Sequence, residues 1–200
     1  KAATRFLNIM QDEAERMNRL VGDLMSLNRV EGNERVRPTQ RVVLNDIIQS
    51  TCHSLQPLAL QAGVKFEFES PELPVEIYGD SDQLTQVFTN IIGNALKYGA
   101  SGGRITLRMT TIAREAAFRA PGVRLQVIDY GAGIDPVHLP RLTERFYRVD
   151  GHRSRELGGT GLGLAIVKNI INRHRGKLTI KSALGEGTTV TVMLPTEPLS

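Results

Sequence analysis

The fold is decided by the stretch Asn90-Ile91-Ile92-Gly93-Asn94-Ala95-Leu96-Lys97-Tyr98, because it carries two helical stripes at once. One stripe is apolar, has the i, i+3, i+4, i+7 spacing of a buried face, and predicts a helix over about 81–98: Leu84, Val87, Phe88, Ile91, Ile92, Ala95 and Leu96. The other stripe is polar and contains Asn90, Asn94 and Lys97. Amide oxygens can bind Mg²⁺ and lysine can neutralise phosphate, although a merely solvated border of the buried face would look the same.

The composition excludes several classes of protein. Of the 200 residues, 40% are hydrophobic and 23% are charged, which is typical of a globular domain plus an appendage. The net charge of +4 is modest, and basic and aromatic residues do not interleave, so we expect no nucleic-acid partner. Cys52 is the only cysteine, which rules out an intrachain disulfide. No run of 18 apolar residues is present, but the chain opens in mid-helix without a start methionine, so we interpret it as a fragment and leave an upstream membrane anchor open.

The first thirty residues form a heptad pattern. Apolar residues alternate at spacings of four and three: Ala3, Leu7, Met10, Ala14, Met17, Val21 and Leu24. This pattern predicts a helix from about Ala3 to Glu31, and extra apolar residues at 6, 20 and 27 favour a helical bundle. Packing against the body of the same chain is the alternative. The polar run 31–37 favours the bundle, with a missing helix or a second subunit as the partner.

The remaining chain alternates between strand and helix patterns. We expect helices over 44–62, 81–98 and 161–174, and strands over 41–43, 64–70, 75–78, 104–112, 123–129, 177–182 and 188–194. A turn is expected at 120–122, a hairpin around 184–187, and one helical turn near 137–142 within the irregular segment 130–160. The predicted fold is a two-layer α/β (α+β) sandwich of a mixed sheet and three helices, preceded by the long heptad helix.

Two glycine-containing segments have features suited to ligand binding. Asp129-Tyr-Gly131-Ala-Gly133 follows an apolar strand, where a carboxylate can accept from an exocyclic amine and glycines allow close approach of a flat ligand. Gly158-Gly-Thr-Gly-Leu-Gly163 runs into a helix, whose free N–H groups suit phosphate. An ordinary turn and a flexible connector are the alternatives for the two segments. Between them, an arginine-rich segment that we call the lid (134–160) is either a cover for phosphates or a solvated loop.

Four motifs together resemble the N, G1, F and G2 boxes of sensor histidine kinases, in their usual order. They are Asn90-x-x-x-Asn94-Ala-x-Lys97-Tyr98, Asp129-x-Gly-x-Gly133, Arg145-Phe-Tyr-Arg148 and Gly159-Thr-Gly-Leu-Gly-Leu164. Arg16-Met-x-x-Leu-Val-x-Asp-Leu24 resembles the second helix of that family's dimerisation and phosphoacceptor hairpin. The resemblance covers nearly the whole chain and is closest to the phosphate-regulon type. It implies residues 1–33 as part of the hairpin and 34–200 as the catalytic ATP-binding domain.

The resemblance also implies roles by position. Asn94 would bind Mg²⁺ with help from Asn90, and Lys97 would contact a phosphate. Asp129 would bind the adenine amine in a pocket shaped by Gly131 and Gly133. Tyr98 would flank the adenine, and Thr189 would reach it through water. The remaining nucleotide-binding candidates come from the lid and the last glycine segment: Phe146, Arg148, Arg153, Gly159, Thr160, Gly161, Leu162 and Gly163.

The implied reaction is transfer of the ATP γ-phosphate to a hairpin histidine, and then to an aspartate of a response regulator. None of the four histidines is followed by an acid or lies on the heptad helix, so we expect the acceptor to lie outside this chain. The intact protein would be a homodimeric, membrane-anchored sensor with this part in the cytoplasm. Two alternatives remain: an ATP hydrolase of the gyrase, mismatch-repair or chaperone kind, and a nucleotide-binding adaptor dimerised by its helix. The hydrolase alternative requires a glutamate where this chain has Asn90, whose amide cannot take a proton.

Overall fold

A five-stranded mixed sheet forms one layer of the molecule in the computed structural model, which describes residues 2–32, 36–116, 119–149 and 159–197. The strand order is β2-β4-β5-β7-β6. β2 pairs parallel to β4 and the other neighbours are antiparallel. The strands span β2 (Lys65–Glu69), β4 (Arg104–Glu115), β5 (Ala120–Asp129), β7 (Gly187–Pro195) and β6 (Lys177–Ala183).

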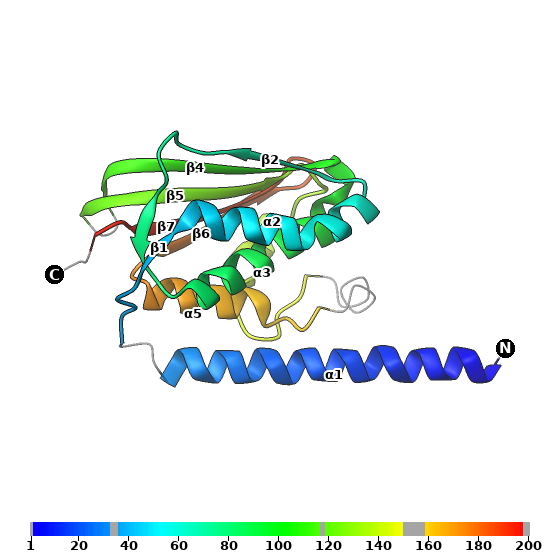
Figure 1. Cartoon of the computed structure of the whole chain (residues 1–200). Helices are drawn as coiled ribbons and strands as arrows, with labels where there is room; N and C mark the ends of the chain where they lie inside the picture. Colours follow the sequence, from blue (N-terminus) through cyan, green and yellow to red (C-terminus); the bar gives the residue numbers. More distant parts are fainter. Residues whose placement is uncertain (1, 33–35, 117–118, 150–158, 198–200) are drawn as a thin grey trace.

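Three helices cover one face of this sheet: α2 (Leu44–Gln61), α3 (Ser81–Gly99) and α5 (Gly163–Arg173) (Figure 1). α3 lies in the middle and contacts both of the others. It begins where the carboxylate of Asp80 accepts a hydrogen bond from the Gln83 amide at 3.1 Å, which caps the first turn. The predicted apolar stripe of α3 is buried, with Phe88 0% exposed. The predicted two-layer sandwich is therefore confirmed.

Two local features differ from the sequence-based expectation. β1 (Arg41–Val43) and β3 (Glu76–Tyr78) pair with each other in a separate two-stranded sheet. The turn expected at 120–122 is wrong, because β5 already begins at Ala120. Pro121 is tolerated there because the β4–β5 register shifts between Ile112 and Glu115, so the ladder does not need its missing N–H. The expected helical turn is present as η2 (Pro136–Arg141), and η1 (Ala100–Gly102) follows α3.

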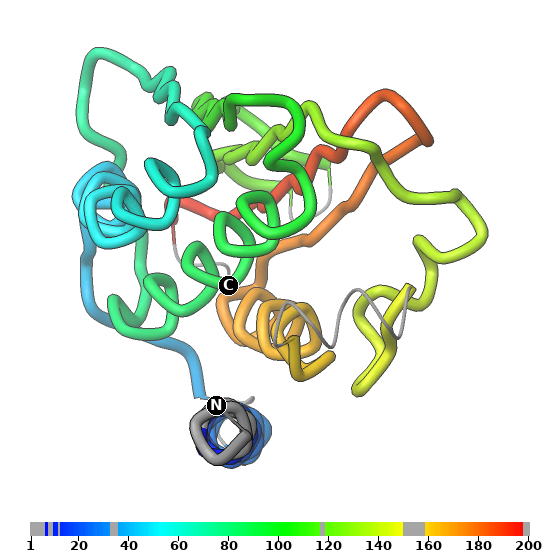
Figure 2. The backbone as a smooth tube through the Cα atoms, turned by 90° about the vertical axis from the view of Figure 1, so that its right-hand side faces the viewer, coloured from blue at the N-terminus to red at the C-terminus, as the bar shows by residue number. Residues whose placement is uncertain are grey.

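The long helix α1 (Ala2–Gly32) runs alongside α5, and its N-terminal end extends past the body of the molecule (Figures 1 and 2). Its last turns are docked: Leu27 is 1% exposed and Val30 2%. Further toward the N-terminus, the apolar residues Leu7, Met10 and Met17 are each more than half exposed. Packing against the same chain is thus correct for the last turns. The bundle stays a prediction for the exposed stripe.

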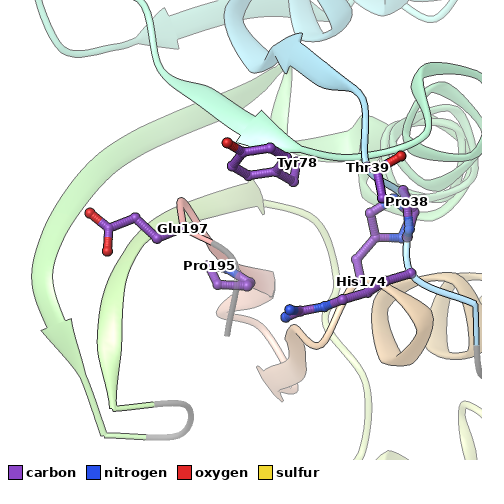
Figure 3. A pocket seen from close by; sticks show the side chains of 7 residues that line it. Pro38, Thr39, Tyr78, His174, Pro195 and Glu197 are labelled. Carbon is purple, nitrogen blue, oxygen red and sulfur yellow. The ribbon is translucent and has the colours of Figure 1, made fainter. Parts of the chain in front are cut away.

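A small cavity of about 140 Å³ lies where the segment after α1 meets the C-terminal end of α5 (Figure 3). Tyr78, His174 and Pro195 are among its lining residues. It lies at the opposite end of α5 from the last glycine segment, roughly 16 Å away by the rise of the helix. This cavity is therefore separate from the residues implicated by the motifs. Among the described residues, no helix has the length and apolar character needed to cross a membrane.

His174 ends α5 in a neutral, fixed tautomer. It is 3% exposed. Its Nε2 accepts from the Asp80 amide at 3.1 Å, and its Nδ1 lies 2.8 Å from the Ile170 carbonyl oxygen, to which it donates. Burial lowers the pKa of His174, and the charges of Arg173 and Arg37 lower it further, against the opposing effects of Ile170 and Asp80. The imidazole therefore joins the end of α5 to the residue that caps the start of α3, as a neutral group.

Lowering the pH from about 8 to about 5.5 should reduce the stability that His174 contributes. The unfolded chain binds a proton near the ordinary histidine pKa of about 6.5, whereas the folded chain binds it only at lower pH, so the free energy of unfolding falls as pH falls. Urea unfolding of wild type and His174→Gln at several pH values measures this, with His53→Gln, on an exposed position of α2, as control. A wild-type advantage over His174→Gln that is constant across this range would contradict the assignment.

Candidate functional site

Helix α3 brings two separate motifs together. At its C-terminal end, Gly99 packs so closely against Asp129 that a Cβ at position 99 would overlap the Asp129 side chain. Two and a half turns earlier, Asn90 Nδ2 donates to the carbonyl oxygen of Gly163, the first residue of α5, at 3.4 Å. Asn90 and Gly99 are about 13 Å apart along the axis, with Asn94 between them. One helix thus links the end of β5 to the start of α5.

Asp129 is a buried carboxylate held by backbone amides. It is 8% exposed, and its Oδ1 accepts from the amides of Gly131 at 3.0 Å and Thr188 at 3.3 Å. Burial raises the pKa of Asp129, and the two amides oppose that effect. Both hydrogen bonds use Oδ1, which leaves Oδ2 as the oxygen for a further donor. Gly131 packs against Gly99, so the backbone comes close here on both sides.

The sheet register separates Thr189 from this group. β5 and β7 pair Asp129 with Thr188, and Ile128 with Thr189. Because side chains alternate between the two faces of a sheet, Thr189 shares the face of Ile128, opposite Asp129. Thr188 was missed by the sequence analysis, although its amide contacts Asp129 directly. Only the register of β7 against β5, which no local pattern specifies, would have identified it.

The last glycine segment is fixed to the lid through backbone contacts. Gly161 has φ +75°, and its carbonyl oxygen accepts from the Phe146 amide at 2.8 Å. The Phe146 side chain is 56% exposed, so its backbone, and not its ring, holds the lid at this point. Leu162 is 0% exposed and anchors the segment in the core. Thr160 Oγ1 accepts from the Leu162 amide at 3.3 Å, which shapes the entry into α5.

The remaining candidate glycines are Gly133 and Gly159, one in each glycine segment. Gly133, with φ +72°, packs against the carbonyl of Ala183 at the β6–β7 hairpin. A hydrogen bond of 2.7 Å from the Gly185 amide to the Ala132 carbonyl oxygen joins the hairpin to this glycine segment. Gly159 is half-buried.

The arginines of the lid differ in their surroundings and in their partners. Arg148 is half-buried in the described part of the lid, and Arg153 lies outside the described residues. Arg141 pairs with Glu144 at 3.1 Å and lies over the Tyr147 ring at 4.1 Å, so this arginine stabilises the lid itself. Arg145 pairs with Glu31 of α1.

Helix α1 contributes side chains that the sequence analysis did not anticipate. Thr160 Oγ1 donates to Asp23 Oδ2 at 2.6 Å. Partial burial lowers the pKa of Lys97, the charge of Arg19 lowers it further, and Asp23 opposes both. Arg19 and Asp23 are therefore within electrostatic reach of the polar stripe of α3. Tyr98, next along that helix, is 41% exposed.

The sequence profile of the family described as "Histidine kinase-, DNA gyrase B-, and HSP90-like ATPase" matches residues 79–198. The chain belongs to this family. The matched range runs from the start of α3 through β7, so this ATPase family accounts for α3, both glycine segments and the lid between them.

The curated relatives of this chain are sensor kinases, which confirms the resemblance to sensor histidine kinases that the four motifs indicated. The phosphate regulon sensor protein PhoR of Pseudomonas aeruginosa is 40% identical over 94% of this chain and 40% of its own length. Sensor histidine kinase RppB of Synechocystis is 35% identical over 94% of this chain and 40% of its own. WalK of Bacillus subtilis is 36% identical over 96% and 31%. The chain thus spans well under half the length of these relatives.

Solved structures show the same fold. The mycobacterial sensor histidine kinase MprB matches with a TM-score of 0.66 at 28% identity, covering 80% of this chain and 99% of that one. The full-length ShkA structure, in complex with AMPPNP, matches with a TM-score of 0.78 at 23% identity over 100% of this chain and 40% of that one. The second match includes α1, so the whole arrangement of α1 and ATPase body has a structural counterpart.

Replacing Gly161 by alanine should destabilise the fold more than replacing Gly63. Both glycines have positive φ, which costs an alanine about 1–2 kcal/mol. A Cβ at 161 would also lie 2.8 Å from the Phe146 Cα, whereas open space surrounds position 63. Denaturant unfolding of Gly161→Ala and Gly63→Ala measures the difference, and hydrogen exchange of the Phe146 amide reports the local contact. Equal losses with unchanged exchange would disprove this packing.

Proposed function

We propose that this chain is the ATP-binding catalytic part of a sensor histidine kinase. In this proposal residues 34–200 bind Mg²⁺-ATP, and residues 1–33 are the second helix of a dimerisation and phosphoacceptor hairpin. The observation that carries it is the double contact of α3, with Asp129 at Gly99 and with Gly163 at Asn90. A base-binding acid and a phosphate-binding helix start are thereby held at the two ends of one polar stripe, as an extended nucleotide requires.

The adenine end rests on Asp129. Its Oδ1 is held by the amides of Gly131 and Thr188, so the carboxylate is oriented before any ligand arrives. A purine amine donating to Oδ2 would favour the charged form that burial disfavours. Gly99 and Gly131 leave no side chain between Asp129 and a flat ring, which fits a base and not a bulky substituent. Tyr98 would flank that ring from the end of α3.

The phosphate end rests on Asn90, Asn94, Lys97 and the start of α5. The amide oxygens are hard donors of the kind Mg²⁺ accepts, and no group of three or more His, Cys, Asp or Glu side chains suited to a metal occurs among the described residues. This donor set fits an ion held mainly by phosphates and water. When bound, Mg²⁺ neutralises phosphate oxygens. The N–H groups of α5 and the ammonium of Lys97 would orient the same phosphates.

Transfer to a histidine is favoured over hydrolysis because the site lacks a base at position 90. Asn90 cannot take a proton from water, and its Nδ2 is engaged with the Gly163 carbonyl oxygen. The acceptor histidine would lie on the first hairpin helix, with a response regulator aspartate receiving the phosphoryl group next. We also propose that the intact protein is a membrane-anchored homodimer, as the resemblance of the four motifs to sensor histidine kinases implies. An adaptor that binds nucleotide without transfer is the alternative.

Asp129→Asn should weaken binding of ATP and ADP equally, by about 1–3 kcal/mol, the size of a lost hydrogen bond to a buried charge. Both nucleotides share the adenine, so the loss should not depend on the γ-phosphate. Calorimetry of Mg²⁺-AMPPNP and ADP binding measures it, with Glu69→Gln, an exposed strand acid paired to Arg108, as control. Unchanged affinity would remove Asp129 from the adenine site.

Asn94→Ala should abolish Mg²⁺-dependent phosphotransfer while leaving the fold intact, because it removes an amide oxygen assigned to the metal. The measurement is transfer of labelled γ-phosphate from ATP to the dimerisation hairpin of the PhoR relative, supplied separately or fused upstream. Circular dichroism checks the fold. Transfer that survives in Asn94→Ala would exclude this residue, and nucleotide binding without any transfer by wild type would favour the adaptor.

A further inference from the structure

One acid of α1 reaches the start of α5. Asp23 Oδ2 accepts from Thr160 Oγ1 at 2.6 Å, a short distance typical of a hydroxyl donating to a charged carboxylate. The same Thr160 oxygen accepts from the Leu162 amide at 3.3 Å. The proton of this hydroxyl is therefore committed to Asp23, and the oxygen shapes the turn before α5.

The same carboxylate is also attracted to Lys97. Asp23 favours the charged form of this lysine, against burial and the charge of Arg19. Thr160 and Lys97 are both among the residues assigned to the nucleotide, Lys97 to its phosphates. In the ligand-free protein, then, an anionic side chain interacts with two groups suited to phosphate oxygens.

Asp23 lies at the boundary between the docked and the exposed parts of α1. One turn further along, Leu27 is 1% exposed, while Val21 and Met25 are 53% and 62% exposed. The docked part is held by polar contacts as well. Ser26 Oγ donates to Gln86 of α3 at 2.8 Å.

Glu31 joins α1 to both α5 and the lid. It accepts from Asn169 Nδ2 of α5 at 3.1 Å and pairs with Arg145 of the lid. Loosening of the docked turns of α1 would therefore also weaken the contact between Glu31 and the lid.

We propose that Asp23 is an internal competitor of the nucleotide's terminal phosphate. Its carboxylate holds the Thr160 hydroxyl when no phosphate is present. A bound triphosphate takes over this hydroxyl, repels the carboxylate and loosens α1 from α5. This inference rests on the proposed ATP site. Because coupling between two binding events is reciprocal, docking of α1 must weaken triphosphate binding as much as the triphosphate weakens docking.

The test compares triphosphate with diphosphate in variants of α1. Calorimetry gives the Kd of Mg²⁺-AMPPNP and of Mg²⁺-ADP for wild type, Asp23→Ala, the isosteric Asp23→Asn, and Glu13→Gln. Glu13 is a matched control, since it is an exposed acid of the same helix paired with Arg16. Hydrogen exchange of peptides covering residues 20–32 reports docking of α1 in each state.

We expect both Asp23 variants to bind AMPPNP roughly 5- to 50-fold more tightly, with a much smaller change for ADP, and Glu13→Gln to match wild type. Exchange in 20–32 should rise on adding AMPPNP to wild type, and be raised already in Asp23→Ala without nucleotide. The inference is overturned if both Asp23 variants keep the wild-type ratio of AMPPNP to ADP affinity. It is also overturned if AMPPNP does not change hydrogen exchange of residues 20–32 in wild type. Either result leaves the proposed function standing. A wild-type chain that binds neither nucleotide overturns both.

Discussion

The burial of one face of α3 is the constraint on which the rest of the site depends. Leu84, Val87 and Phe88 are fully enclosed between the sheet and the neighbouring helices, each worth roughly 1.5–3 kcal/mol of burial. That packing fixes the rotation of the helix about its axis. The polar stripe must then run along its other side, and the end of the helix must meet β5. Core packing therefore sets the position of the polar stripe, and the amides of Gly131 and Thr188 orient Asp129 at the end of the helix.

The sequence predicts what depends on local pattern and misses what depends on pairing at long range. Periodicity located α3 and α5, and a strand followed by an acid and glycines identified Asp129. The sequence pattern could not distinguish Thr188 from Thr189, because neighbouring residues on a strand differ only in the face of the sheet on which they lie, and the register decides that face. Leu162 fell within a nucleotide-binding motif, yet its side chain is a core residue. The contact of Asp23 with Thr160 joins residues 137 positions apart, beyond any local signal.

The heptad helix has two roles in one continuous element. Its last turns belong to the core of the ATPase body, while its N-terminal turns present an apolar stripe to solvent. Because both parts belong to one helix of 31 residues, a partner bound to the exposed stripe would act on the same element that contacts the lid through Glu31. The separation of docked and exposed turns therefore matters more than either alone.

The position of β7 has a consequence for how the protein is made. This strand is the last in the described chain, yet it lies inside the sheet, hydrogen-bonded to β5 on one side and β6 on the other. Until β7 has left the ribosome, β5 has an unpaired edge and the helices lack part of the sheet surface that they cover. The ATPase body must therefore finish folding after translation of its final hairpin, and a truncation within that hairpin removes an interior strand and exposes an aggregation-prone edge.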